Sequence, residues 1–252
     1  MENWLDLLLP FMLLTGRIGA FFSVLPIFGW RALPVRVRAG MALIVSVFFA
    51  MVMPPSPEML AVTQWPIAVV LLIREILTGL ALGLAAQLVF TAASQAGRIG
   101  GRQMGFALAN IIDPVSGETA QPISLLFEIT FALLFLAAGG HRVLLLVIGK
   151  SYEAFPVTHT PDLGHLAAAV LSAGSVMFLF ALKLAAPMLA AFIILAVVLG
   201  ITARVLPEMN VLMTALPLRV AVGLFMAAAL MPALHGFASD LADWLSRNLI
   251  ST

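Results

Sequence analysis

The sequence predicts an all-α integral membrane protein, and its composition and patterning lead to that prediction. Of the 252 residues, 62% are hydrophobic and only 10% are charged, and the mean hydropathy is +1.11. Soluble domains are closer to half apolar and a quarter charged. The apolar residues gather in long runs without strand-like alternation, and only helices or closed barrels can cross a bilayer. We therefore expect helices throughout.

Six apolar runs are expected to be helical. All but the second approach or exceed the ~20 residues that a membrane span needs, and the second is short. We find no internal repeat and no linker long enough to separate two parts, so residues 1–252 are expected to form one membrane domain. The six runs are 7–29, 39–53, 66–96, 123–148, 166–203 and 211–234.

Two of these runs are too long for a simple span. As straight helices, residues 66–96 and 166–203 would measure about 46 and 57 Å at ~1.5 Å per residue. The hydrocarbon core of a bilayer is only about 30 Å thick. Tilt does not absorb that excess. Each run is therefore expected to bend, to fold as a hairpin, or to rise out of the bilayer against other protein.

The composition argues against several classes of function. A net charge of +1 gives no nucleic-acid footprint, and the absence of cysteine excludes thiol chemistry and disulfides. The sequence has no GxxxxGK[ST], HExxH or GxSxG pattern. The four histidines are scattered without metal-ligand spacing. We expect no enzyme, no cofactor and no metal site.

Besides Arg142, six charged residues lie inside the apolar runs, where charges are costly and usually face protein or water. They form structural or assembly ion pairs, which we favour, or they mark a substrate or proton path. Arg74 and Glu75 are adjacent, so on a helix they point about 100° apart and do not pair directly. The six residues are Arg17, Arg74, Glu75, Glu128, Lys183 and Arg219.

Lys183 and Pro187 are four residues apart in the over-long fifth run. Proline has no N–H to donate to the carbonyl group of the residue four positions earlier, so a helix kink is expected at Pro187. Secondary transporters build substrate sites at broken helices. An isolated proline kink is much commoner than such a site.

Small residues spaced four apart occur at Gly79 and Gly83 and again at Gly101 and Gly105. This GxxxG spacing lets helices approach closely. The signal is weak in a chain rich in glycine and alanine. It fits a chain that packs tightly, within itself or in an assembly.

The stretch "GFALANIIDPVSG" interrupts the apolar pattern after the third run. Glycines at 97, 100, 101 and 105 are expected to end the helix, and Asp113–Pro114 followed by Ser-Gly is a strong turn signal. Residues 106–122 are therefore expected to form a compact loop. Its apolar residues either tuck against the chain's own helices or plug a pore, because such a loop at membrane level must pack in protein or line a cavity.

This loop, with its flanks "GRQMGFALANIIDPVSGETAQPIS", resembles the corresponding region of the FliR family, the flagellar type III export-gate proteins. "GRIGAFFSVLPIFGWRALPVRVRAGMALIVS" resembles the family's N-terminal region. "GGHRVLLLVIGKSYEAFPV" and "LKLAAPMLAAFIILAVVLGITARVLPEMNVLMTALPLRVAVGL" resemble its middle and C-terminal regions. The ordered set covers nearly the whole chain, with Glu208 as a departure where glutamine is expected. The injectisome homologues of the SctT type are a near variant.

The resemblance implies bent helical hairpins that look like a FliP-type and a FliQ-type unit fused, within a helical pore assembly. It implies FliP-like, FliQ-like and FlhB-like partners in the bacterial inner membrane at the flagellar basal body, and unfolded protein substrates in transit. It also implies a pore plug at about 106–122, with a gasket near its start. Carried onto this sequence, the plug and gasket candidates are Met104, Phe106, Leu108, Asn110, Ile111, Ile112, Asp113 and Pro114.

A function from another class stays open at this point. The chain could be a secondary solute transporter that uses the Lys183–Pro187 break and the Arg74–Glu75 pair of charges as its substrate site. A transporter should purify as a monomer or symmetric dimer, whereas a gate subunit should co-purify with different small membrane proteins.

Overall fold

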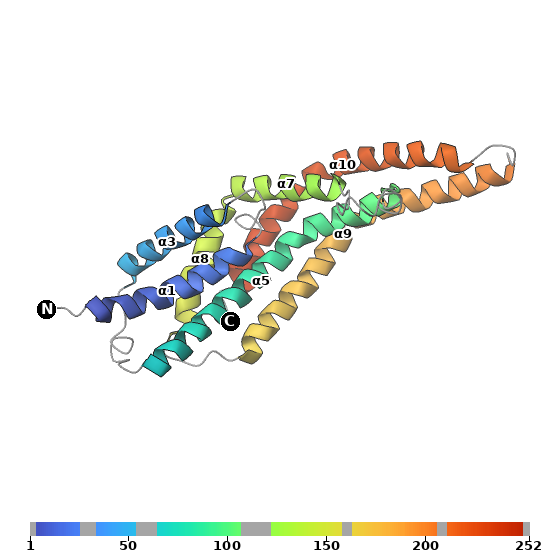
Figure 1. The fold of residues 1–252 in the computed structure, drawn as a ribbon. Coiled ribbons are helices and arrows are strands. Elements are labelled where there is room, and N and C mark those ends of the chain that lie inside the picture. Colours follow the sequence, from blue (N-terminus) through green and yellow to red (C-terminus); the bar gives the residue numbers. More distant parts are fainter. Residues whose placement is uncertain are drawn as a thin grey trace, which may run out of the picture. The chain divides into compact units, whose positions relative to one another are not determined.

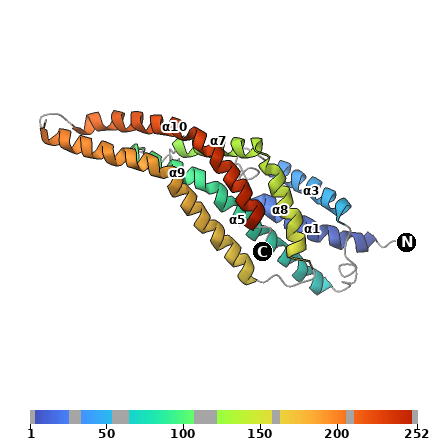
Figure 2. The same ribbon diagram turned by 180° about the vertical axis from the view of Figure 1, so that it is seen from behind.

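The computed structural model describes residues 4–25, 34–53, 65–106, 122–157, 163–205 and 211–248. Every regular element in these ranges is an α-helix, as Figures 1 and 2 show from two sides. The prediction of an all-α chain is thus confirmed. The helices are α1 (Trp4–Val24), α3 (Val35–Val52), α5 (Trp65–Gln103), α7 (Pro122–Ala137), α8 (Gly140–Ala154), α9 (Leu163–Val205) and α10 (Val211–Asn248).

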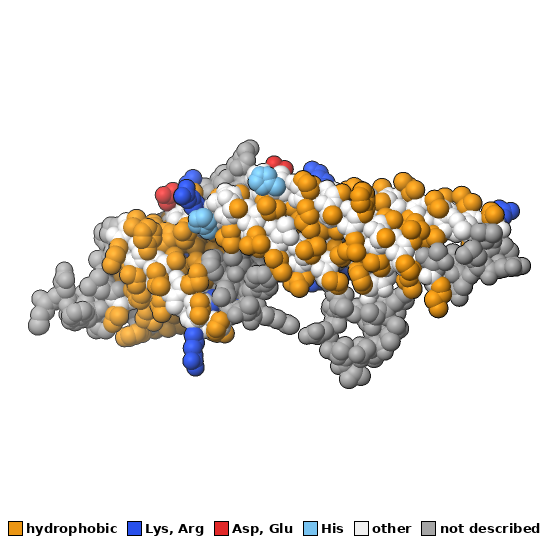
Figure 3. Space-filling view, turned by 90° about the horizontal axis from the view of Figure 1, so that it is seen from above, with side chains coloured by type: hydrophobic (Ala, Val, Ile, Leu, Met, Phe, Trp, Pro, Cys, Tyr) orange, Lys and Arg blue, Asp and Glu red, His pale blue; other side chains and the backbone are white. Residues whose placement is uncertain are grey.

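Four helices are long and apolar enough to cross a membrane. They are Val35–Val52, Trp65–Gln103, Gly164–Val205 and Ala215–Leu241, and the bent pair α7 and α8 counts as a fifth if it is one span. The apolar part of α1, Leu8–Val24, is shorter. Most side chains of the four helices stay outside the chain's own core, as expected where lipid or another subunit covers them. Figure 3 shows one face on which hydrophobic side chains predominate.

The two over-long runs each form one continuous helix rather than a hairpin. α5 has 39 residues and α9 has 43, and Pro187 lies inside α9 without ending it. The run 123–148 was expected to be one helix, and this expectation was wrong. It forms α7 and α8, separated at Gly139, whose φ of 81° suits glycine because it lacks a Cβ.

The prediction that Gly97, Gly100 and Gly101 release the third helix was also wrong. α5 continues through all three, and the first positive φ, 91°, comes at Gly105. The reason is packing. A Cβ at Gly97 would lie 2.7 Å from the Cα of Ser124 in α7, so glycine here allows close helix contact.

The described chain divides into two compact units. The first contains Met1–Val89, Gly139–Ser175 and Leu241–Thr252, and the second contains Phe90–Ala138 and Val176–Asp240. The chain passes between them inside α5, α9 and α10 as well as at the break between α7 and α8.

Aromatic rings tie together the four helices of the second unit. Phe90 of α5 meets Phe135 of α7 edge to face, with the ring centroids 4.6 Å apart. Phe131 of α7 lies 5.3 Å from Phe237 of α10, and Phe237 lies 4.7 Å from Phe180 of α9. Such pairs contribute beyond the area they bury. The aromatic contacts therefore fix the positions of these helices within the second unit.

Candidate functional site

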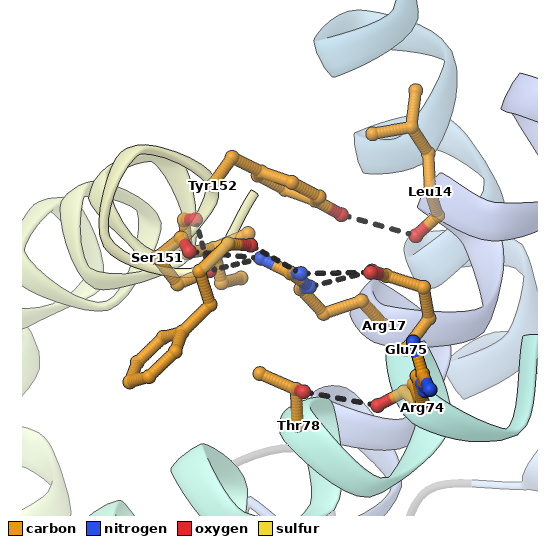
Figure 4. Close-up of polar contacts among 9 residues, drawn as sticks. Leu14, Arg17, Arg74, Glu75, Thr78, Ser151 and Tyr152 are labelled. Atoms are coloured by element: carbon orange, nitrogen blue, oxygen red, sulfur yellow. Dashed lines mark hydrogen bonds and ion pairs between the residues drawn. The ribbon is translucent and has the colours of Figure 1, made fainter. Parts of the chain in front are cut away.

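The most buried charged pair of the described chain joins α1 to α5 in the first unit. Arg17 and Glu75 are each 2% exposed. The Nε of Arg17 donates to Oε2 of Glu75 at 2.6 Å, and a terminal nitrogen donates to Oε1 at 2.8 Å, as Figure 4 shows. This is the bidentate geometry in which a planar guanidinium binds a carboxylate most specifically.

The remaining donors of Arg17 reach α8 and the residues after it. One terminal nitrogen donates to the carbonyl oxygen of Ser151 at 2.9 Å and to its hydroxyl oxygen at 3.3 Å. The other also donates to the carbonyl oxygen of Phe155 at 2.8 Å. Arginine has five N–H donors, and these bonds give each of them an acceptor.

Tyr152 covers the guanidinium group. Its ring centroid lies 4.1 Å from the Cζ of Arg17, a cation–π distance, and its hydroxyl donates to the carbonyl oxygen of Leu14 at 3.4 Å. We call Arg17, Glu75, Ser151, Tyr152 and the Phe155 carbonyl group the Arg17 clamp. It joins α1, α5 and α8 and leaves no open polar group of Arg17 for a ligand.

Glycines make the clamp possible by letting α1 and α5 approach. A Cβ at Gly79 would collide with the carbonyl oxygen of Arg17, and one at Gly83 would lie 2.9 Å from the carbonyl oxygen of Phe21. The GxxxG spacing of α5 is therefore a contact within this chain.

Arg74 does not take part in the ion pair, in agreement with the helical angle between neighbours. Its side chain is half-buried, and its carbonyl oxygen accepts a hydrogen bond from the hydroxyl of Thr78 at 2.9 Å (Figure 4). The two adjacent charges thus have different surroundings. They do not form a shared substrate site.

The other three of the six charges lie in the second unit. Glu128 on α7 and Arg219 on α10 are half-buried. Lys183 on α9 is exposed, and its Nζ lies 5.5 Å from the centroid of the Phe180 ring. Pro187 is also exposed. Arg17–Glu75 is the ion pair found among the described residues.

The start of the predicted plug is placed in part. Met104 is 1% exposed, and its side chain occupies the space where a Cβ on Gly223 of α10 would lie. Phe106 is half-buried in the turn after α5. The other plug candidates lie outside the described residues: Leu108, Asn110, Ile111, Ile112, Asp113 and Pro114.

Sequence reasoning missed Ser151 and Tyr152. The available signal was the polar stretch "GKSYE" directly after the run 123–148, together with the need of a buried arginine for several acceptors. Within the described ranges, no group of three histidine or acidic residues is placed to hold a metal ion.

The fold and the buried clamp define a multi-pass membrane protein built for helix packing. Residues 8–244 match the family described as bacterial export proteins, family 1. The chain therefore belongs to this family.

Relatives from several organisms support the assignment. The chain is 37% identical to the flagellar biosynthetic protein FliR of Bacillus subtilis (strain 168), over 90% of this chain and 87% of the relative. It is 32% identical to FliR of Pectobacterium carotovorum subsp. carotovorum, over 96% of this chain and 90% of the relative. It is 31% identical to FliR of Escherichia coli (strain K12), over 95% of this chain and 91% of the relative. The chain is thus a FliR-family protein, a multi-pass inner-membrane component of the flagellar protein export apparatus at the basal body.

Proposed function

We propose that this protein is a pore-forming core subunit of the flagellar type III export gate. It passes unfolded flagellar subunits across the inner membrane, and the loop at about 106–122 closes the pore when no substrate is present. Its partners are FliP-like, FliQ-like and FlhB-like membrane proteins. It carries out no catalysis itself.

The way in which α5 ends is the observation that supports a plug most directly. Met104 is buried against Gly223, and Gly105 then turns the chain at a φ of 91°. A loop that starts from a buried residue has a fixed root, and a glycine at the root allows its direction to change. Both properties suit a segment that seals a pore and swings aside. Phe106, half-buried beside this root, is the first gasket candidate.

The transporter alternative has less support. Glu75 and Arg17 satisfy each other, α9 continues through Pro187, and Lys183 lies on an exposed face. A substrate site at a discontinuous helix uses the free backbone groups of unwound turns. The described part of α9 has no unwound turn.

Native mass spectrometry of the tagged protein, purified in mild detergent from its own host, tests the proposal. We expect one large complex with one copy of this chain and several copies of two other small membrane proteins. A lone monomer or a homodimer, with solute uptake in vesicles, would contradict the proposal and favour the transporter.

A further inference from the structure

The part of α9 in the second unit has two different faces. One face is buried in the unit's own core and includes Ala181, Leu184, Met188 and Phe192. At ~100° per residue the opposite face is centred near Ala190 and Val197, and Lys183 and Ile194 lie on it. That face is exposed, so nothing in the described chain covers it.

Six exposed residues lie along one stripe of this face. Successive members are four, three, four, three and four residues apart, so a second helix packed along α9 on this side would meet all of them. Ile194, Val197 and Ile201 are 66%, 58% and 60% exposed. We call this set the α9 seam: Lys183, Pro187, Ala190, Ile194, Val197 and Ile201.

Lys183 gives the seam a charge that lipid chains do not neutralise. Its Nζ lies 5.5 Å from the Phe180 ring, and no described carboxylate lies within ion-pair distance of it. Pro187 also has no N–H to donate to the carbonyl group of Lys183. A charged side chain and an unpaired carbonyl group on an apolar helix face are costly in lipid. In a helix pair, a lysine at a contact position specifies the register of the partner helix.

A second copy of the same helix does not supply the missing charge. α9 contains no aspartate or glutamate between Leu163 and Val205. A parallel copy in register would place Lys183 against Lys183, and like charges repel. The occupant must therefore be a different helix.

We propose that the α9 seam binds a helix of a different membrane subunit, and that this helix carries an apolar seam and a carboxylate that pairs with Lys183. The ion pair sets the register of the two helices, and the apolar contacts supply the buried area. This inference rests on the proposed function, because it requires a hetero-oligomeric complex.

Charge variants of Lys183 test the pairing in the complex purified from the host. Lys183→Arg keeps the charge and should assemble nearly normally. Lys183→Met leaves the partner's carboxylate unpaired, and Lys183→Glu adds repulsion, so we expect the yield of complex to fall about tenfold or more for Lys183→Glu and less for Lys183→Met. Lys150→Met, at an exposed lysine of α8 in the first unit, is the matched control and should leave the yield unchanged.

Photo-crosslinking identifies what covers the seam. A benzophenone amino acid at Ile194 should give an adduct with one subunit of the purified complex. The same label at Ala196 is exposed but lies about 200° around the helix, and it should not give that adduct. Replacing the acidic residue nearest the crosslinked site by lysine should restore assembly of Lys183→Glu.

Three results would overturn the inference while leaving the proposed function intact. The first is normal yield of the complex with Lys183→Glu. The second is a benzophenone label at Ile194 that reacts only with lipid, and the third is a label at Ile194 that reacts with a second copy of this chain. If no complex forms with the wild-type protein, the proposed function itself fails.

Discussion

Arg17 of α1 is held by contacts with two other helices, α5 and α8, and with the Phe155 carbonyl group after α8, so no single neighbour accounts for its position. Its five donors bind a carboxylate, a hydroxyl and two carbonyl oxygens, and a tyrosine ring covers its face. A buried charge is tolerated only when it is paired and hydrogen-bonded in this way. The clamp is therefore a positioning device for helices.

Removing one partner of the clamp should destabilise the protein strongly. Glu75→Gln leaves the arginine charge buried without its counter-charge, and breaking such a pair costs about 3–5 kcal/mol. We expect a large drop in the thermal unfolding midpoint in detergent, followed by intrinsic fluorescence.

Arg74→Gln is the control for that prediction, because Arg74 is adjacent, half-buried and outside the clamp. Its midpoint should change little. The double variant Arg17→Met/Glu75→Leu should be more stable than Glu75→Gln, since apolar replacement of a whole buried pair is often neutral. Equal midpoints for Glu75→Gln and wild type would refute the clamp.

At the scale of residues, the sequence predicts which charges lie in apolar surroundings but not their partners. Arg17 and Glu75 are 58 residues apart, and nothing local distinguishes Glu75 from Glu128 as the acceptor. The pairing depends on how α1 crosses α5, which is a tertiary property. The hydrogen bonds from Arg17 to Ser151 and to the Phe155 carbonyl group could not be predicted for the same reason.

At the scale of elements, glycine determines how closely helices pack. Gly79→Ala would place a methyl group against the carbonyl group of Arg17, so α1 and α5 must separate and the clamp must stretch. Overpacking of this kind typically costs about 1–3 kcal/mol. We expect a lower unfolding midpoint and a lower yield of complex for Gly79→Ala.

Gly19→Ala on α1 is the matched control. A Cβ at Gly19 meets nothing within 4 Å, and alanine is the better helix former. Its midpoint should be unchanged or slightly raised. If Gly79→Ala and Gly19→Ala have the same unfolding midpoint, the contact between α1 and α5 is not tight.

Most helices could be predicted from hydropathy, whereas their ends could not. Apolar runs located every described helix, but the glycines of α5 were interpreted as breakers although they are contact positions. Glycine has both roles, and only the neighbouring helix decides between them. The break at Gly139 was missed although the stretch "GGHR" marks it, because apolar residues resume at Val143.

At the scale of the whole molecule, the plug proposal makes a prediction about leakage. Deleting residues 107–120 from assembled complexes should raise the permeability of the membrane to ions and small solutes, because the closed pore loses its seal. Ion flux into vesicles that contain the purified complex measures the effect. Phe106→Ala should cause a smaller leak.

A leak caused by the missing plug has to be distinguished from a leak caused by incomplete assembly of the complex. Complex yield is therefore measured beside ion flux, and Gly19→Ala serves again as a variant expected to assemble and seal normally. Unchanged permeability in fully assembled deletion complexes would contradict the plug.

The family resemblance predicted a component of the flagellar export apparatus, which physical reasoning alone did not. Composition and periodicity led to a helical membrane protein and left the transporter open. They do not reveal which exposed faces meet lipid and which meet protein, since both are apolar. The residues of the α9 seam illustrate this limit, because only the charge of Lys183 distinguishes that face from a lipid-facing one.

The chain contains a single tyrosine, and that residue is Tyr152 of the clamp. Growth on fluorotyrosine would therefore place one fluorine atom in the protein, directly over the Arg17 guanidinium group. Its NMR resonance would report the packing of α1, α5 and α8 without any engineered label. Because the native sequence is unchanged, the same signal could be followed in the free chain and in an assembly whose other subunits remain unlabelled.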